Sequence, residues 1–155
     1  MVKKLDRIIY PPLEDHVGAR LWRLSELWKK EFDEEMVSLG YTYFAEARSN
    51  LIRYIGPGGV PQSVIVARMK FSKQAVQQLL DGLVQDGVVE RHPDPSDKRG
   101  KLIMLTQKGL QALHDANRVK RRIDRDYEKR IGPKKFAGLI QALEELAVSI
   151  VGDKK

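Results

Sequence analysis

The stretch FSKQAVQQLLDGLVQDGVVERHPDPSDKRGKLIMLT, residues 71–106, begins with the pattern of an amphipathic α-helix. Ser72 is a residue type that often caps a helix N-terminus, because its hydroxyl accepts a hydrogen bond from a backbone N–H of the first turn. Apolar residues then recur at the three- and four-residue spacing of one helix face: Val76, Leu79, Leu80 and Leu83. We therefore expect a helix that buries this face and leaves the opposite face free.

The free face carries short or flexible hydrogen-bonding side chains near the N-terminal end of the helix: Ser72, Lys73, Gln74, Gln77 and Gln78. A glutamine amide presents a donor and an acceptor together, which matches the N6 and N7 atoms of adenine in the major groove of DNA. Lysine suits phosphate, and serine reads bases less strictly. We expect these residues to contact DNA, and the alternative is an ordinary solvated helix surface.

Two strands are predicted after the helix. Gly87 can end the helix in a left-handed conformation, residues 88–92 have the pattern of a short strand, and residues 101–105 have that of a returning strand. The segment between them, PDPSDKRGK, is rich in turn residues and positive charge. Residues 63–70 form a short helical pattern just before the helix described above. Helix, tight turn, helix and hairpin make a winged helix-turn-helix.

This stretch resembles the recognition helix and wing of the MarR family of transcriptional regulators. The most specific features are the wing motif and the start of the following helix: Asp94-Pro95-x-Asp97-x-Arg99 and Leu105-Thr106-x-x-Gly109. The resemblance covers residues 42–109 in motif and the flanking helices in pattern. It implies a mainly α-helical fold, with a two-stranded β-hairpin wing on a winged helix-turn-helix core between long N- and C-terminal dimerisation helices.

The resemblance also implies the function: a homodimer that binds a pseudo-palindromic operator in double-stranded DNA and acts as a repressor. A small aromatic or anionic effector would bind between the dimerisation helices and the core. Aromatic and arginine residues occur near that junction, but they are as readily explained as core, so no ligand residue is assigned. The rival functions are a winged helix for protein or RNA contact and a small helical enzyme.

The wing is expected to contact DNA through basic side chains. Arg99 at the hairpin tip suits a narrow minor groove, where A·T-rich sequence concentrates negative potential. In the family, an aspartate two residues earlier holds the arginine guanidinium, which implies this role for Asp97. Lys98 and Lys101 are expected to contact phosphates. The alternative for Asp97 and Arg99 is a solvated surface ion pair of little energetic value.

The flanking sequence predicts helices on both sides of the core. Helical patterns run from residue 13 to 39, from Thr42 to residue 55, from residue 107 to 130, and from 134 to 151 after the break at Gly132. Residues 1–12 are predicted to form an extended arm. We expect one domain over residues 1–155, divided into an arm and dimerisation helix (1–40), the winged core (41–106) and further dimerisation helices (107–155).

Composition narrows the functional classes. The net charge of +7 favours a polyanionic partner, whereas the absence of cysteine excludes disulfides, a cysteine nucleophile and cysteine-based sensing. No signal peptide or long apolar run is seen, so we expect a cytoplasmic protein with no membrane partner. The scattered His16, His92 and His114 do not suggest a metal site, and no catalytic motif or cofactor motif is evident. The basic residues of 120–135 alternate with acidic ones, which favours an ion-paired surface over a second DNA contact.

Overall fold

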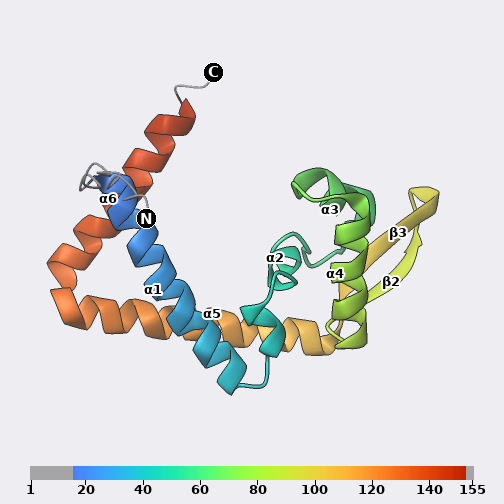
Figure 1. Cartoon of the computed structure of the whole chain (residues 1–155), viewed down its shortest axis with the longest axis horizontal. Coiled ribbons are helices and arrows are strands. Elements are labelled where there is room, and N and C mark those ends of the chain that lie inside the picture. Colours follow the sequence, from blue (N-terminus) through green and yellow to red (C-terminus); the bar gives the residue numbers. More distant parts are fainter. Residues whose placement is uncertain (1–15, 153–155) are drawn as a thin grey trace, which may run out of the picture.

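The computed structural model describes residues 16–152, while residues 1–15 and 153–155 lie outside that description. The elements follow in this order: α1 (Val17–Ser38), the 3-10 helix η1 (Thr42–Ala45), α2 (Ser49–Ile52), β1 (Val60–Pro61), α3 (Gln62–Arg68), α4 (Lys73–Gln85), β2 (Val89–Asp94), β3 (Asp97–Leu105), α5 (Gln107–Ile131) and α6 (Pro133–Gly152). Figure 1 shows the winged helix-turn-helix at one end of α5 and the α1 and α6 helices at the other. The mainly α-helical winged architecture predicted from the sequence is confirmed.

The predicted ends of α4 and the start of α5 are confirmed in atomic detail. The Ser72 hydroxyl accepts a hydrogen bond from the backbone N–H of Ala75 at 3.1 Å. Gly87 follows α4 with a φ of 68°, a left-handed conformation that glycine adopts without steric cost. Thr106 caps α5 by accepting a hydrogen bond from the Gly109 N–H at 3.1 Å. Ser72 and Gly87 thus mark the two ends of α4, the predicted recognition helix, and Thr106 marks the start of α5.

The wing is a tighter hairpin than the sequence predicts. Strands β2 and β3 pair in antiparallel fashion as far as Asp94 and Asp97, with an irregularity between Pro93 and Asp94, so most of the predicted turn belongs to the strands. The Asp94 carboxylate makes this short turn possible, because its Oδ1 accepts hydrogen bonds from the Ser96 N–H and hydroxyl at 2.8 and 2.6 Å. Within the described residues the sheet also has a third strand, β1, which pairs with β3 and was not predicted.

The helix predicted to run from Thr42 to residue 55 is wrong. The structure has the short helices η1 and α2 there, separated at Glu46, which has an extended backbone. Thr42 does not cap a helix, because Tyr41 holds the N-cap position without a side-chain hydrogen bond. The break lets consecutive aromatic side chains, Tyr43 and Phe44, both enter the core, which a regular helix would turn to different faces.

The long terminal helices are close to their predicted limits. Helix α1 begins at Val17, four residues later than predicted, and His16 caps it by accepting a hydrogen bond from the Ala19 N–H at 3.2 Å. Residues 13–15 of the predicted helix and the predicted arm of residues 1–12 lie outside the described residues. The break at Gly132 between α5 and α6 is confirmed. Among the described residues, no helix is both long and apolar enough to cross a membrane.

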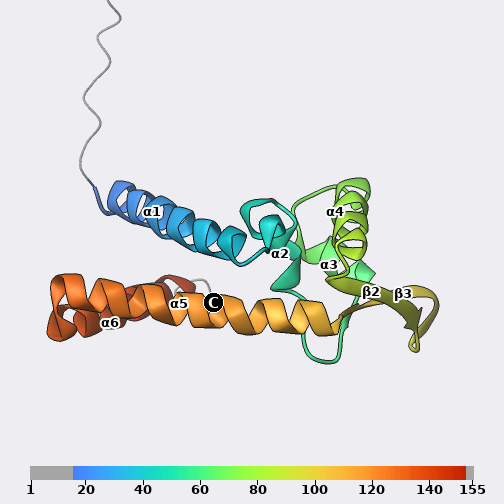
Figure 2. The same ribbon diagram turned by 90° about the horizontal axis from the view of Figure 1, so that it is seen from below.

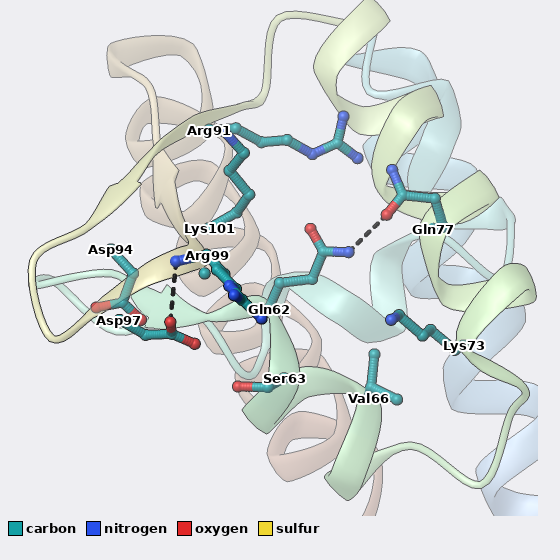
Figure 3. Close-up of a pocket in the computed structure, with 11 residues that line it drawn as sticks. Gln62, Ser63, Val66, Lys73, Gln77, Arg91, Asp94, Asp97, Arg99 and Lys101 are labelled. Atoms are coloured by element: carbon teal, nitrogen blue, oxygen red, sulfur yellow. Dashed lines mark hydrogen bonds between the residues drawn. The ribbon is translucent and has the colours of Figure 1, made fainter.

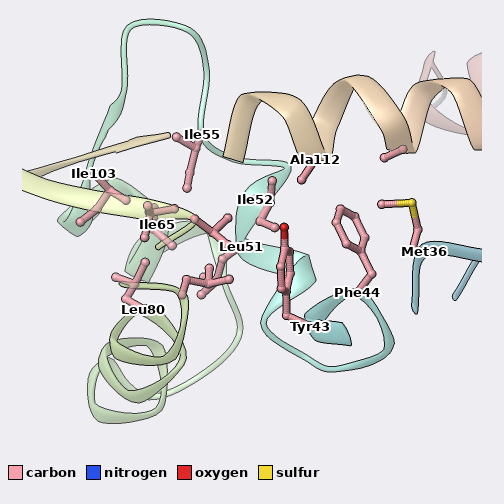
Figure 4. Packing of buried hydrophobic residues seen from close by; sticks show 14 of the residues in the cluster. Met36, Tyr43, Phe44, Leu51, Ile52, Ile55, Ile65, Leu80, Ile103 and Ala112 are labelled. Carbon is pink, nitrogen blue, oxygen red and sulfur yellow. The ribbon is translucent and has the colours of Figure 1, made fainter. Parts of the chain in front are cut away.

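One continuous core joins the winged end of the molecule to the α1–α5 pair. Leu51, Ile65 and Leu80 pack with Ile103 inside the winged domain, and Figure 4 shows this cluster continuing toward Ala112 of α5. The chain of buried contacts extends to Met36 of α1 and Ile123 of α5. Figure 2 shows α1 above α5, with α6 folded back along its far end. The recognition helix is therefore packed rigidly onto the same core as the long helices.

Candidate nucleic-acid interface

A groove of about 630 Å³ separates the recognition helix from the wing. Its walls come from α3, α4, β2 and β3, and Figure 3 shows their side chains converging on it. The lining residues are Gln62, Ser63, Val66, Lys73, Gln77, Arg91, Asp94, Asp97, Arg99, Gly100 and Lys101. Four of them are cationic and two are acidic, so the groove is suited to a polyanion.

The structure brings the predicted residues of α4 to one exposed end of the helix. Lys73 and Gln77 line the groove. Gln74 and Gln78 are exposed on the same helix but do not line it. The Ser72 hydroxyl is occupied as the N-cap, which explains its presence without any ligand. The helix thus presents three amide groups and one ammonium group from its first turns.

Gln77 differs from the other two glutamines because it is half-buried and already hydrogen-bonded. Its Oε1 accepts from Gln62 Nε2 at 2.5 Å, and its Nε2 donates to Asp81 Oδ1 at 3.1 Å. Gln62 stands at the start of α3, so this contact joins the two helices of the helix-turn-helix (Figure 3). The orientation of the Gln77 side chain is therefore fixed by its neighbours in the free protein.

The wing places three cations in exposed positions near its tip: Lys98, Arg99 and Lys101. The expected contact between the Asp97 carboxylate and the Arg99 guanidinium is wrong. Asp97 Oδ1 instead accepts a hydrogen bond from the backbone N–H of Arg99 at 2.9 Å (Figure 3). The physical reason is that the tight turn brings the Arg99 backbone within reach of the carboxylate, and the guanidinium has no ion-pair partner within residues 16–152.

Asp94 is a structural residue of the same turn. It is 8% exposed. The hydrogen bonds from the Ser96 hydroxyl and then the Ser96 N–H keep the pKa of its carboxyl below the usual range. The Asp-Pro-x-Asp motif of the wing therefore supplies two carboxylates that hold backbone, one on each side of the turn.

Arg91 and Gln62 are the residues that sequence analysis missed. Arg91 projects from β2 toward α4, where its Nη2 lies 2.7 Å from Asp81 Oδ1. The Arg91 Nε and Nη2 atoms are both buried without a hydrogen bond among the described residues, so the contact with Asp81 is an ion pair by distance and not a well-aligned hydrogen bond. The alternation of β2 could have placed Arg91 on the face opposite Glu90, but nothing in the sequence pairs Gln62 with Gln77, which is fifteen residues away.

One polar contact links the winged domain to α5, and another, within the winged domain, links the segment before α2 to the end of α4. Tyr41 Oη donates to Asp115 Oδ2 of α5 at 2.7 Å. Arg48 crosses the C-terminal part of α4, where its Nη1 donates to Asp86 Oδ2 at 2.6 Å. A Cβ at Gly82 would lie 2.8 Å from Arg48 Cδ, so a larger residue there would displace the Arg48 side chain from this position. These contacts fix the orientation of α4 relative to α5.

The basic region 120–135 is partly ion-paired. Arg122 contacts Glu35 of α1 and Asp126 of α5 at 2.8 and 3.0 Å, and Lys129 lies 3.6 Å from Asp126. These contacts agree with an ion-paired surface that also holds α1 against α5. Among residues 16–152, no group of three or more His, Asp or Glu side chains could hold a metal ion.

The far end of the molecule has large exposed apolar surfaces. None of the residues of α6 is buried, and α1 exposes further apolar side chains toward its N-terminus. The exposed positions are Val17, Leu21, Trp22, Leu24 and Leu27 on α1, and Ile140, Leu143, Leu146, Val148, Ile150 and Val151 on α6. Large exposed apolar patches on a protein surface are typical of protein–protein contacts.

Comparisons with known proteins find a family profile, curated transcriptional regulators and solved structures. A sequence profile of the MarR family matches residues 47–100. The HTH-type transcriptional regulator BilQ of Clostridium symbiosum (strain WAL-14163) is 31% identical over 90 residues, which are 57% of this chain and 58% of that regulator. Across three curated relatives, all named as transcriptional regulators, the chain spans 53% to 63% of their lengths.

Solved structures share the fold over most of the chain. Wild-type MarR from E. coli in its apo form superposes with a TM-score of 0.71 at 21% identity, covering 86% of this chain and 97% of that one. The MepR–DNA complex from S. aureus gives a TM-score of 0.65 at 17% identity, covering 88% and 99%. The arrangement of winged core and long helices is therefore common to this chain and these structures.

Proposed function

Because this chain belongs to the MarR family, we propose that it is a transcriptional regulator that binds a specific sequence of double-stranded DNA as a homodimer. The observation that carries the proposal is the groove between α4 and the wing, where exposed amides and cations from both elements converge. A recognition helix and a basic wing on one face can engage the major groove and an adjacent minor groove together.

The individual roles follow from the chemistry of each side chain. Gln74, Gln77 and Gln78 would read base edges in the major groove, because amides present a donor and an acceptor. Lys73, Lys98 and Lys101 would neutralise phosphates, which gives affinity that falls with salt. Arg99 would enter the minor groove with its free guanidinium, and Asp97 would hold the backbone from which Arg99 projects.

The homodimer is supported by the exposed apolar faces of α1 and α6. Two copies joined there would place their α4 helices in successive major grooves of a pseudo-palindromic site, about one helical turn apart. The winged core of residues 41–106 would form the DNA-binding part of each copy. The terminal helices on either side would form the dimerisation part.

We further propose that the dimer acts in the cytoplasm as a repressor and that a small aromatic or anionic effector relieves it. The support comes from packing, because each α4 packs on a core that is continuous with α5. A change in how the two copies meet would therefore alter the distance between the two winged domains. The effector would bind more tightly to a dimer whose α4 helices are wrongly spaced for successive major grooves than to the DNA-binding dimer. Such an effector would lower DNA affinity by the difference between its binding free energies for the two states.

The test is a binding selection from random duplex DNA with the wild-type protein and the variants Gln77→Ala and Arg99→Ala, at two salt concentrations. We expect a palindrome whose inner positions relax in Gln77→Ala and whose flanking A·T preference or affinity is lost in Arg99→Ala. Enrichment of no sequence, with the three proteins binding equally, would overturn the proposal and favour a winged domain for protein or RNA contact.

A further inference from the structure

The Gln77 side chain belongs to a series of polar contacts that joins α3, α4 and β2. Gln62 Nε2 of α3 donates to Gln77 Oε1 at 2.5 Å, and Gln77 Nε2 donates to Asp81 Oδ1 at 3.1 Å. Asp81 Oδ1 lies 2.7 Å from Arg91 Nη2 of β2. Helix α3 and strand β2 are thus connected through two side chains of α4, Gln77 and Asp81.

This series determines which way round the Gln77 amide points. An amide turned by 180° has nearly the same shape, but it would bring its NH2 group against the NH2 group of Gln62 and its oxygen against the Asp81 carboxylate. The contact with Asp81 would then be repulsive, since an ionised carboxylate only accepts hydrogen bonds, and Gln62 would have to turn its own amide to restore the other bond. The ion pair with Arg91, 2.7 Å away, favours the observed position of the half-exposed Asp81 carboxylate.

We propose that Gln62 is a positioning residue that fixes the orientation in which Gln77 presents its amide to a base pair. The inference rests on the proposed DNA-binding function and deepens it. With one N–H used by Asp81 and one lone pair by Gln62, the Gln77 amide keeps one N–H donor and one oxygen lone pair for a base. A donor and acceptor in fixed order distinguish A·T from T·A, whose major-groove edges present the same groups in reversed order.

The role of Gln62 is separable from the stability of the fold. Its side chain lines the open groove, so shortening it leaves space that water can fill and creates no buried cavity. The substitution Gln62→Ala therefore removes the donor to Gln77 while α3 is retained. Gln62→Glu goes further, because the new carboxylate accepts only and favours the turned amide.

The experiment measures binding to operator variants that differ only at the base pair whose preference is weakened most, but not abolished, in Gln77→Ala. We expect Gln62→Ala to reduce the ratio of A·T to T·A affinity by about fivefold or more. In the Gln77→Ala background, adding Gln62→Ala should leave the ratio unchanged. Gln62→Glu should reduce the ratio further than Gln62→Ala. Gln85→Ala, an exposed glutamine at the other end of α4, is the matched control and should leave the wild-type ratio intact.

Two results would overturn the inference while the proposed function survives. One is an A·T to T·A affinity ratio that Gln62→Ala leaves unchanged. The other is an equal loss of this ratio in the wild-type and Gln77→Ala backgrounds, which would mean that Gln62 reads the base itself. If the wild type shows no sequence preference, the proposed function is wrong, but the positioning role of Gln62 can still be tested by a measurement that needs no DNA. In the free protein, Gln62→Ala should shift and mobilise the side-chain NH2 resonances of Gln77, whereas Gln85→Ala should not. Unchanged Gln77 resonances would defeat the positioning role independently of DNA binding.

Discussion

At Gly109, helix α5 passes so close to the end of the recognition helix that a Cβ atom would lie 2.2 Å from the carbonyl oxygen of Val88. That contact involves backbone on both sides, so neither partner can rotate away. We expect Gly109→Ala to destabilise the protein by about 2 kcal/mol or more, although alanine favours a helix by about 1 kcal/mol over glycine. The measurement is the midpoint of urea unfolding.

The matched control is Asn117→Ala, an exposed position on the same helix. It should change the free energy of unfolding by no more than about 0.5 kcal/mol. Equal midpoints for the two variants would mean that α5 can move away from Val88 at little cost. The glycine of the Leu-Thr-x-x-Gly motif would then have no steric role.

A second residue-scale prediction concerns Asp97, whose carboxylate holds the Arg99 backbone and not its guanidinium. Asparagine keeps a carbonyl oxygen that can accept the same bond, whereas alanine cannot. We expect Asp97→Ala to speed hydrogen exchange of the Arg99 amide and to reduce the effect of Arg99 on DNA binding. Asp97→Asn should resemble the wild type in both. An Asn variant as defective as the Ala variant would show that the negative charge itself is needed.

At the scale of elements, the contact between Tyr41 and Asp115 connects the end of α1 and η1 to α5. The hydrogen bonds from Tyr41 and then Gln111 hold the pKa of the Asp115 carboxyl below its usual range, with Arg118 at 3.2 Å and His114 at 3.8 Å from Oδ1 as the charged neighbours. A lowered pKa in the folded state stabilises the fold above the unfolded pKa of about 3.9. This contribution is lost as the pH falls through the lowered folded value.

The substitution Tyr41→Phe tests this contact. It should lower the free energy of unfolding at neutral pH, and the difference from the wild type should shrink as the pH falls below about 4. The same hydrogen bond raises the pKa of the Tyr41 hydroxyl, so the difference should also shrink as the pH rises above about 10. Tyr54→Phe, at another half-buried tyrosine, is the control. A difference that stays constant from pH 3 upward, or that matches the control, would contradict the role of the bond.

The sequence predicts the long elements well because their ends are determined locally. Ser72, Thr106 and Gly132 each act on the backbone within one turn, so residue type alone marks the boundary. The same holds for the recognition helix, whose apolar stripe is buried as expected at Val76, Leu80 and Leu83. Local chemistry therefore specified the part of the fold that carries the candidate DNA contacts.

The errors occur where contacts between distant residues override local pattern. The expected helix after Thr42 is broken because Tyr43 and Phe44 are both needed in a core shared with α1 and α5. Strand β1 forms because Val60 pairs with Ile103 of β3, and the sequence of residues 60–61 alone does not predict this pairing. The Gln62 and Arg91 contacts to α4 depend on the same tertiary arrangement, which is why the candidate site was predicted only in part.

For the whole molecule, the apolar faces of α1 and α6 are the feature that a single chain leaves unexplained. Leu143 and Leu146 lie one turn apart on α6 and remain 37% and 43% exposed, while Trp22 on α1 remains 71% exposed. Burying apolar surface contributes about 25 cal/mol per Å², so leaving two such helices in water is costly. A second copy that brings the same faces together removes them from water by symmetry, which is the usual geometry of a homodimer.

The substitution Leu143→Asp tests this arrangement, because it places a charge in the middle of the apolar stripe of α6. We expect the variant to sediment as a monomer at concentrations where the wild type is a dimer, and Trp22 fluorescence to report a more exposed ring. Specific DNA affinity should fall steeply, because a single winged domain binds only one half-site. The winged core should remain folded, because Leu143 is not part of its buried cluster. Gln141→Asp adds the same charge on the opposite side of α6 and should remain dimeric. If Leu143→Asp also remains a dimer with unchanged DNA affinity, the two copies do not meet through α6, and the spacing between the two winged domains must be set by another surface.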